Sequence, residues 1–551
     1  METTKIEAQG GNAPVAVVSV EAQLAEAQAA TAKEHSMSLW RGIMTYPKAI
    51  GWSVVFSTAI IMEGYDVVLM GSFFAYPAFN DRYGDLQPDG TKALTAAWQA
   101  GLTNAMYCGQ IMGLLATGTV SERFGYRKTI IGALTSVIAF IFILFFAPNK
   151  QTLIVGEIFM GVPLGVFQTI TVTYASEICP IVLRAYLTTY VNICWIFGQI
   201  IGAGVLRGLL NRTDEWAYRI PFAIQWVWPV PLIVAIFMAP ESPWWLVRKS
   251  RIEEATESLR RLANGPEQDL SETISMMVHT IALEDQLCEG TTYWSCFTGT
   301  NLRRTEISCL TWAVQNLCGA GLMAYSTYFY ENAGLPTDKA FDMSLALYAI
   351  GFFGTLFSWV FMSQFGRRTL YMGGLFALCV ILLIVGFISL APGASTIITK
   401  PDGSTQSANI GTAWATGSML LVLAFVYDCT VGPVCYSLVS EIPSTRLRNK
   451  TVVLARSLYN IIGIINGIII PYMLNPTAWN WAGKAGFFWG GMCFLSALWT
   501  FFRLPEPRGR TFSELDYLFE RGVSARKFSS TPVDVFGNEL EKSAAVIEHK
   551  D

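Results

Sequence analysis

Charged residues are scarce in this chain. Lysine, arginine, aspartate and glutamate make up 14% of its 551 residues, whereas a soluble domain carries about 25%. So few charges do not cover the surfaces of several soluble domains, which disfavours a soluble enzyme, a nucleic-acid-binding protein and a disordered scaffold. The net charge of −3 also speaks against a polyanionic partner such as a nucleic acid.

Histidine is rare as well. The three histidines are His35, His279 and His549, and all fall outside the apolar blocks described next. A histidine proton relay or a buried zinc site is therefore not expected. The eleven cysteines form no Cys-x-x-Cys pair, so we expect ordinary apolar side chains rather than metal ligands. No nucleophile–base pair stands out, and we predict no enzyme, no metal and no cofactor.

Apolar residues, 52% of the chain, are gathered in twelve blocks. Each block is about 20 residues long, which is enough to cross the ~30 Å hydrocarbon core of a bilayer. The blocks are 49–75, 96–118, 129–147, 152–175, 186–207, 219–239, 306–330, 341–362, 370–391, 411–438, 451–474 and 485–503. We predict an all-α membrane protein with twelve transmembrane helices.

A charged segment, 240–304, divides the blocks into two sets of six. The predicted parts are a disordered cytoplasmic tail (1–45), a six-helix bundle (46–239), a cytoplasmic central loop with short helices (240–304), a second bundle (305–505) and a C-terminal tail (506–551). Lysine and arginine gather on the side of the termini, which the positive-inside rule assigns to the cytoplasm. Asn211 begins an Asn-Arg-Thr sequon, a candidate glycosylation site in an outer loop.

The two halves share motifs in the same order. Ser-Glu-Ile at 176–178 precedes Arg184, and Ser-Glu-Ile at 440–442 precedes Arg448 with the same spacing. The other two pairs are Phe-Gly-Tyr-Arg at 124–127 with Phe-Gly-Arg-Arg at 365–368, and Pro-Glu-Ser-Pro at 240–243 with Pro-Glu-Pro at 505–507. We therefore predict two parallel six-helix repeats that face each other across a central cavity.

The inner connections combine acids and arginines at helix ends. Such groups form charge-assisted pairs, so we expect a network that latches the inner side closed and breaks when the bundles tilt. The alternative is that these residues only determine the topology. The predicted network contains Glu122, Arg123, Arg127, Glu177, Arg184, Arg367, Arg368, Glu441 and Arg448.

Five ionisable residues lie inside the apolar blocks: Glu63, Asp66, Glu157, Asp428 and Arg456. Each costs ~2.5–3.5 kcal/mol at the bilayer centre, so each is expected to face a cavity or a partner. Glu63 and Asp66 are three positions apart and share a helix face. Two close carboxylates favour binding of a proton, and Arg456 supplies a compensating charge. Glu157 is a further candidate for proton coupling, and its alternative, near a block end, is an interfacial position. The alternative is a structural hydrogen-bond network.

Amide side chains supply the other polar groups of the blocks. They are Asn192, Gln199, Gln315, Asn316 and Asn460. An amide offers donors and an acceptor, which suits the vicinal hydroxyls of a sugar. The alternative for a single amide is a hydrogen bond between helices. The aromatic candidates for stacking on a pyranose ring are Tyr325, Tyr436 and Trp195, for which lipid or core packing is the alternative.

Taken together, these motifs resemble the sugar porter family of the major facilitator superfamily. The resemblance covers about residues 45–520. Within the family, the segments 63–66 (EGYD), 174–199 and 454–460 (LARSLYN) are similar to fungal maltose and general α-glucoside permeases. The resemblance implies proton coupling by Asp66, Glu63 and Arg456. It also implies sugar contacts by Asn192, Gln199, Gln315 and Asn316, and a place for Asp428 in the inner charge network.

The chain also departs from the family pattern. Glu157 stands where many proton-linked hexose porters carry an arginine that pairs with the acid equivalent to Asp66, and Gln110 stands where some α-glucoside permeases carry a glutamate. Glycine occupies two family asparagine positions, Gly321 and Gly354. We expect the space left by those two side chains to admit the second ring of a disaccharide.

The resulting hypothesis is a proton symporter that imports α-glucosides such as maltose across the plasma membrane. Its expected partners are the sugar, the proton and the lipid bilayer, with no nucleic acid, and it is expected to work as a monomer with both termini in the cytoplasm. The alternatives are a hexose porter, either proton-linked or facilitative, and a sugar sensor that does not transport. Maltose, trehalose, sucrose and isomaltose are not distinguished by the residues.

Overall fold

The structure is a computed structural model. It describes residues 38–87, 90–264, 267–288, 292–394, 397–399, 405–444, 447–508, 510 and 512–531. Most of the two predicted tails, with His35 and His549, lies outside these residues. Residues 39–45, which we assigned to the tail, form a short helix, α2 (Leu39–Thr45), whose N-terminus is capped by Ser38.

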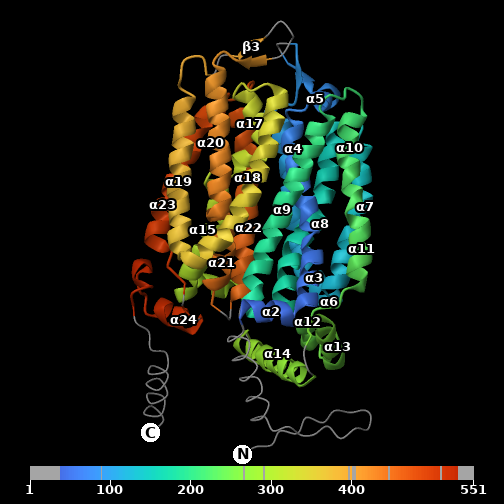
Figure 1. The fold of residues 1–551 in the computed structure, drawn as a ribbon, viewed down its shortest axis with the longest axis vertical. Helices are drawn as coiled ribbons and strands as arrows, with labels where there is room; N and C mark the ends of the chain where they lie inside the picture. Colours follow the sequence, from blue (N-terminus) through green and yellow to red (C-terminus); the bar gives the residue numbers. More distant parts are fainter. Residues whose placement is uncertain are drawn as a thin grey trace, which may run out of the picture.

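The first half of the chain forms one helical bundle (Figure 1). Its helices are α3 (Pro47–Ser57), α4 (Ile60–Phe73), α6 (Ala96–Phe124), α7 (Tyr126–Phe145), α8 (Lys150–Ile178), α9 (Ile181–Leu209), α10 (Trp216–Ile224), η1 (Gln225–Val227) and α11 (Pro229–Met238).

The second half forms the other bundle. Its helices are α15 (Gly299–Leu317), α16 (Gly321–Ala324), α17 (Ser326–Asn332), α18 (Thr337–Gln364), α19 (Arg367–Ile388), α20 (Ile410–Cys429), α21 (Val431–Glu441), α22 (Arg448–Leu474), η3 (Ala482–Lys484) and α23 (Ala485–Arg503).

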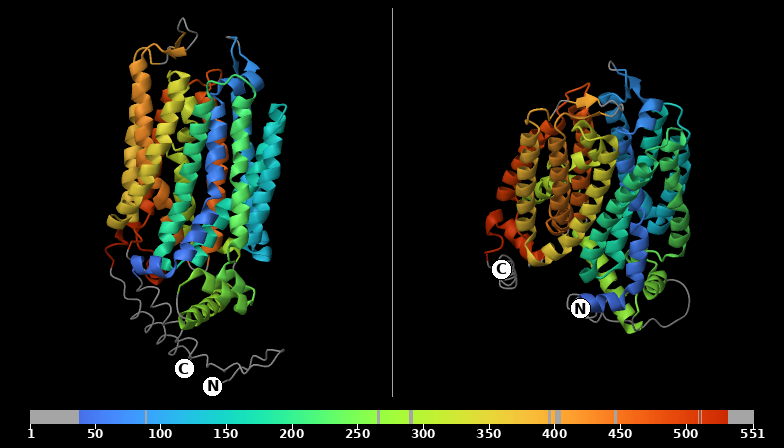
Figure 2. Two further views of the ribbon diagram at one scale, coloured as in Figure 1. Left: turned by 45° about the vertical axis from the view of Figure 1, so that its right-hand side comes forward. Right: turned by 45° about the horizontal axis from the view of Figure 1, so that its top comes forward.

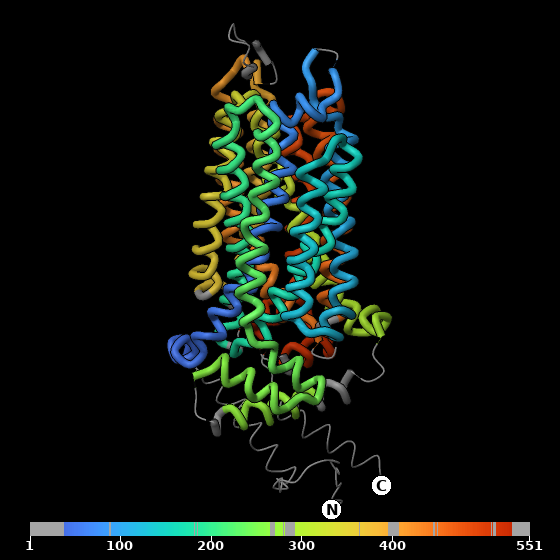
Figure 3. The backbone as a smooth tube through the Cα atoms, turned by 90° about the vertical axis from the view of Figure 1, so that its right-hand side faces the viewer, coloured from blue at the N-terminus to red at the C-terminus, as the bar shows by residue number. Residues whose placement is uncertain are grey.

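Shorter elements cover the two ends of the molecule. The end that carries α12 (Pro243–Arg248), α13 (Ile252–Leu262), α14 (Glu267–Cys288), η2 (Tyr293–Phe297), α24 (Phe512–Glu520) and η4 (Ala525–Lys527) is called the terminal side. The opposite end, the loop side, carries α5 (Pro77–Tyr83) and the hairpins β1 (Asp85–Leu86) with β2 (Lys92–Ala93) and β3 (Ile397–Thr399) with β4 (Thr405–Ser407). Figure 3 shows the helices of the central segment lying across the terminal side.

Ten helical segments of the described chain are long and apolar enough to cross a membrane. The two remaining predicted spans fall on α6 and on α15 to α17. Helix α6 has 29 residues but carries several polar side chains, among them Gln99, Asn104 and Gln110. The span from α15 to α17 is broken into three pieces, and α15 begins with charged residues. Residues of both spans line the central cavity, where polar groups and helix breaks are tolerated.

The two bundles stand side by side (Figure 2). Helix α22 of the second bundle packs along α6 of the first, and α18 packs along α9. Within the first bundle, the backbones of α4 and α9 come into contact because each helix has a glycine where the two cross, Gly64 in α4 and Gly198 in α9. A Cβ atom at Gly64 would overlap the carbonyl oxygen of Trp195, and one at Gly198 would overlap that of Ile61. This close approach fixes the rotation of α4, which carries Glu63 and Asp66.

Besides the span from Trp216 to Met238, which the 3₁₀ turn η1 divides, three membrane-crossing helices of the described chain are interrupted. The breaks are at Thr58–Ala59 between α3 and α4, at Cys318–Ala320 between α15 and α16, and at Thr430 between α20 and α21. Gly319 supplies the positive φ of 87° at the second break. Just after the third break, the carbonyl oxygen of Gly432 in the first turn of α21 accepts a hydrogen bond from Gln315 Nε2 at 2.8 Å.

Candidate functional site

A central cavity lies between the two bundles. It encloses about 800 Å³ of empty space and is lined from both halves. The polar and aromatic side chains of its wall are Glu63, Tyr107, Gln110, Gln168, Trp195, Gln199, Gln315, Asn316, Tyr348, Tyr427, Asp428 and Tyr459. A cavity lined by a few convergent polar groups is typical of small-molecule sites.

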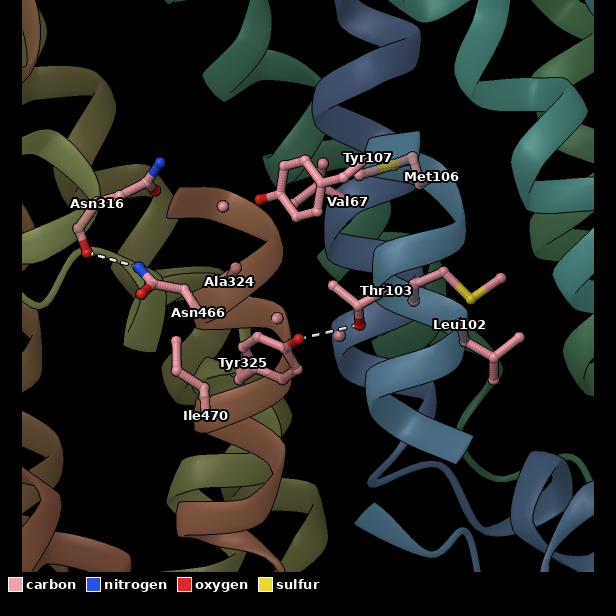
Figure 4. A pocket seen from close by; sticks show the side chains of 15 residues that line it. Val67, Leu102, Thr103, Met106, Tyr107, Asn316, Ala324, Tyr325, Asn466 and Ile470 are labelled. Atoms are coloured by element: carbon pink, nitrogen blue, oxygen red, sulfur yellow. Dashed lines mark hydrogen bonds between the residues drawn. The ribbon is translucent and has the colours of Figure 1, made fainter. Parts of the chain in front are cut away.

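A second space of about 510 Å³, the loop-side cavity, continues from the central one. Figure 4 shows its wall: Thr103 and Tyr107 of α6 face Asn316, Asn466 and Tyr325 of the second bundle. The two cavities share the lining residues Val67, Met106, Tyr107, Asn316, Gly321 and Ala324. The two cavities therefore adjoin each other, with these residues at their boundary.

Glu63 is tied to Arg456 of the opposite bundle through one side chain. Gln168 donates a short hydrogen bond to Glu63 Oε1, and Arg456 Nε donates to Gln168 Oε1 at 3.2 Å. Gln110 Nε2 lies 3.4 Å from the same oxygen of Glu63. The Arg456 guanidinium also lies 4.6 Å from the ring centres of both Trp312 and Tyr459, a cation–π arrangement that holds its charge beside the cavity.

Asp66 has a different environment from Glu63. Its side chain is fully buried within the first bundle, where Oδ1 accepts a hydrogen bond from Gln225 Nε2 at 3.0 Å. The carboxyl group of Glu157 lies beside that of Asp66 and is also fully buried, and within the described residues no donor reaches either of its oxygens. The α8 turn that carries Glu157 packs against α4, which places this candidate for proton coupling inside the first bundle. Two buried carboxyl groups in contact can share one proton, because two adjacent buried negative charges are unfavourable.

Four of the predicted sugar-contact residues line the central cavity: Trp195, Gln199, Gln315 and Asn316. Gln315 and Asn316 each use their amide nitrogen in a backbone hydrogen bond, Gln315 to Gly432 and Asn316 to Tyr459 at 2.9 Å. Their amide oxygens are left as acceptors toward the cavity. Asn192 contacts Thr355 of the opposite bundle, with 3.5 Å between Nδ2 and Oγ1.

Other predicted residues lie elsewhere. Tyr325 lines the loop-side cavity. Tyr436 packs edge-on against Trp312, with 4.9 Å between ring centres. Asn460 is fully buried, and within the described part of the chain its amide atoms have no hydrogen-bond partner. Asp428, which the resemblance placed in the inner charge network, lines the central cavity instead.

The two glycines at family asparagine positions differ. Gly321 lines both cavities, but a Cβ atom there would lie 2.6 Å from Ile470 Cδ1, so the isoleucine fills part of the space. A Cβ at Gly354 would meet Phe425 O at 3.0 Å and Asp428 Cβ at 3.1 Å. Gly354 lines neither cavity, so the room that we expected from this glycine is taken by α20.

The bundles touch directly on the loop side. Ser72 and Thr327 share a hydrogen bond at 3.1 Å, and Tyr325 donates to Thr103 at 2.9 Å. Arg207 Nε donates to Asp342 at 2.5 Å. These contacts close the space above the loop-side cavity.

On the terminal side, two glutamates cap helices at equivalent places in the halves. Glu241 accepts hydrogen bonds from the backbone amides of Tyr126 and Arg127 at the start of α7. Glu506 accepts from those of Arg367 and Arg368 at the start of α19. Burial raises the pKa of Glu241, and the backbone amides oppose this. We had noted both motifs as repeats but had not assigned this role to the glutamates.

The predicted inner network is partly assembled. Glu177 accepts from Tyr126 at 3.0 Å, from Arg248 at 2.9 Å and from Ser242. The equivalent Glu441 is paired with Arg367 at 3.4 Å. Each of these pairs lies within one bundle and its adjoining segment.

The remaining predicted members of the network have other positions. Glu122 and Arg123 are exposed. Arg127 donates to the Ala239 carbonyl oxygen, and Arg368 donates to that of Phe501. Arg184 is half-buried on α9, and Arg448 begins α22. Asn211 is exposed just beyond α9, on the loop side.

The sequence reasoning missed Gln168, Tyr107 and Asn466. Gln168 and Asn466 are amides inside apolar blocks, the same signal that singled out Gln199 and Gln315, and applying it to every block would have found them. Nothing in the spacing of residues indicates that Gln168 bridges two bundles, because the bridge depends on how α8 and α22 face each other.

Known proteins resemble the chain throughout its length. The family model described as "Sugar (and other) transporter" matches residues 52–519. The general alpha-glucoside permease of Saccharomyces cerevisiae is 44% identical over 519 residues, which cover 93% of this chain and 82% of the permease. The maltose permease MAL61 of the same yeast is 45% identical over 534 residues, covering 96% of this chain and 84% of that protein. These relatives are permeases and not enzymes.

Solved structures match the fold. The inward open form of the xylose transporter XylE from E. coli has a TM-score of 0.67 at 20% identity and covers 85% of this chain and 99% of its own. XylE is a member of the major facilitator superfamily, so the predicted fold is confirmed. With the family model and the yeast permeases in agreement over almost all of its length, this multi-pass membrane protein belongs to the sugar transporter family.

Proposed function

We propose that the protein imports α-glucosides such as maltose together with protons. The observation that carries the proposal is the central cavity between the bundles, whose wall combines amide side chains with acids. Amides provide the paired donors and acceptors that vicinal sugar hydroxyls need. The names of the yeast relatives, an alpha-glucoside permease and a maltose permease, support this substrate class.

In this proposal, Trp195, Gln199, Gln315 and Asn316 contact the sugar. Asn192 contacts it in another state of the transport cycle, when its contact with Thr355 opens. Tyr325 forms the loop-side wall, while Tyr436 and Asn460 act through packing on the neighbouring helices. Each of these roles follows from where the side chain lies relative to the two cavities.

Protons are carried by the acids of the first bundle. Asp66 and Glu157 hold a shared proton inside the bundle, and Glu63 senses the state of the cavity through Gln168 and Arg456. When the bundles tilt, the bridge from α8 to α22 breaks, because its two ends belong to different rigid bodies. Loss of the Arg456 charge nearby favours protonation of Glu63, which couples the proton to the movement.

We also propose that the terminal side faces the cytoplasm and the loop side faces the outside of the plasma membrane. The excess of lysine and arginine on the terminal side supports this orientation, and the exposed sequon at Asn211 lies on the opposite side. The pairs of Glu177 and Glu441 then form part of the inner network. The central cavity is lined entirely by residues of one chain. We therefore propose that the monomer is the working unit.

The driving force is sufficient for accumulation. A membrane potential of about 100 mV is worth ~2.3 kcal/mol per charge, and one pH unit adds ~1.4 kcal/mol. Together they sustain a several-hundred-fold gradient of sugar with one proton per molecule.

The test is an uptake panel in cells that lack their own sugar transporters. Labelled maltose, trehalose, sucrose, isomaltose and glucose are offered in turn while the external pH is recorded, with and without a protonophore. We expect maltose uptake to alkalinise the medium and the protonophore to abolish accumulation. Uptake of glucose alone would identify a hexose porter, and the absence of any uptake would favour a sensor.

A further inference from the structure

The loop-side cavity is built differently from the central one. Seven side chains of the central wall are acids or amides, whereas the loop-side wall has only two, Asn316 and Asn466. Four of its lining positions are glycines. These glycines allow close packing of the neighbouring residues Ala324, Ile470, Tyr107 and Asn104. A wall with many hydrogen-bonding groups discriminates between stereoisomers, and a largely apolar wall tolerates ligands of different shape.

The two cavities are stacked along the helices. On α4, Glu63 lines the central cavity, Val67 lines both, and Gly71 lines the loop-side cavity. Eight residues of α-helix rise about 12 Å, which is longer than a single six-membered ring. On α22 the same order holds, from Tyr459 at the central cavity to Ile470 at the far end of the loop-side cavity.

Polar groups are present where a second ring would lie. Figure 4 shows the hydroxyl of Tyr107 pointing across the space toward Asn316. Asn466 Nδ2 is held by the Asn316 carbonyl oxygen at 2.7 Å, which leaves its amide oxygen as an acceptor. These groups suit a few hydroxyls without fixing all of them.

We infer that the loop-side cavity is the subsite for the second sugar unit of an α-linked disaccharide, while the central cavity holds the glucosyl unit. The inference rests on the proposed function. It assigns a different role to each wall: the amide-rich central wall recognises the common glucosyl ring, and the largely apolar loop-side wall accepts second units of different structure. Ile470, which lines only the loop-side cavity, limits the size of that unit.

The test replaces Ile470 by a larger and by a smaller side chain. Ile470→Phe fills the loop-side cavity, and Ile470→Ala enlarges it. Methyl α-glucoside carries the glucosyl ring without a second ring, so it is the one-ring probe. For each variant, the inhibition constants of maltose and of methyl α-glucoside are measured against the same labelled substrate, and their ratio is taken. Because both constants come from one preparation, differences in expression cancel.

We expect Ile470→Phe to raise the maltose to methyl α-glucoside ratio about tenfold, since a steric change of this size at a pocket wall is worth roughly 10- to 200-fold. Ile470→Ala should not raise it. The matched controls are Ile468→Phe and Ile468→Ala, because Ile468 lies on the same helix with its side chain exposed at the bundle surface. Should Ile470→Phe fail to reach the membrane, Met70→Phe fills the same cavity from the opposite wall.

The inference is overturned if the filling variant leaves the ratio within about twofold of wild type, a change too small for a steric block, or if Ile468→Phe shifts the ratio equally. A wild-type protein that transports neither sugar overturns the proposed function as well. A wild type that transports both, with a ratio that no variant moves, overturns only the assignment of the subsite.

Discussion

Glu63 of the first bundle and Arg456 of the second are connected by a single side chain, that of Gln168. Its amide nitrogen donates to Glu63, and its amide oxygen accepts from Arg456 at 3.2 Å. An amide is suited to this position because it satisfies an acceptor and a donor at once. Glu63 is therefore linked to the opposite bundle by hydrogen bonds rather than by a direct ion pair.

Gln168→Leu removes both hydrogen bonds and keeps a side chain of similar length. A buried carboxylate that loses one charge-assisted hydrogen bond is destabilised by about 1.5–3 kcal/mol. Glu63 would then hold its proton throughout the cycle, so we expect the variant to lose most of its maltose-driven proton uptake. The measurement is the alkalinisation of a weakly buffered medium on addition of maltose. Gln151→Leu, at an exposed position of the same helix, is the control. Unchanged proton uptake in Gln168→Leu would contradict the coupling role.

The carboxyl pair of Asp66 and Glu157 makes a separate prediction. Asp66→Asn should lose uphill uptake of maltose but retain exchange between internal and external sugar, because exchange needs no net proton movement. Asp81→Asn, in an exposed position on the loop side, should behave like the wild type. Retained accumulation in Asp66→Asn would count against Asp66 as a proton carrier.

Replacing the partner shifts the pH dependence of uptake. In Glu157→Gln, Asp66 faces an amide that can donate a hydrogen bond rather than a second acid, which favours its charged form. A lower pH is then needed to load the proton, and the external pH of half-maximal uptake should fall by about one unit, equivalent to ~1.4 kcal/mol. The profile is measured at saturating maltose. A shift to higher pH would show that the two carboxyl groups do not interact in this way.

The capping glutamates predict effects on stability. Glu241→Gln and Glu506→Gln each remove a negative charge from a helix N-terminus, which should lower the free energy of unfolding by about 1–2 kcal/mol. The effects should add in the double variant, since the two sites lie in different bundles. Thermal unfolding of the detergent-purified protein is the measurement. Glu257→Gln, in an exposed pair on α13, serves as the control and should change stability little.

The loop-side contacts predict an effect on the conformational equilibrium. Ser72→Ala removes a hydrogen bond between the bundles, while Thr327 keeps its bond to Ser344. If this contact stabilises the state closed on the loop side by about 0.5–1.5 kcal/mol, external maltose should bind about two- to tenfold more tightly, because more of the protein is open to it. Ser57→Ala on the preceding helix α3, where the hydroxyl bonds within its own helix, is the control. Weaker binding of external maltose to Ser72→Ala would show that the Ser72–Thr327 contact does not stabilise the state closed on the loop side.

The properties that the sequence determined by itself are those that depend on short segments. The length and apolarity of blocks such as 129–147 and 370–391 specify membrane helices, because a bilayer excludes any segment with unsatisfied backbone groups. The repeated motifs at 176–184 and 440–448 indicated the two halves and the family. The apolar block 306–330 also predicted a helix where α15 lies, although α15 begins with charged residues.

The tertiary structure decided which side chains meet. Glu63 and Asp66 are neighbours on one helix, yet one faces the cavity and the other a buried acid, because α8 packs against both. Asp428 lies at the central cavity rather than among the inner charges. The bridge through Gln168 depends on the distance between two bundles. Such contacts depend on helix rotation and crossing, which packing over the whole molecule sets and a local pattern does not encode.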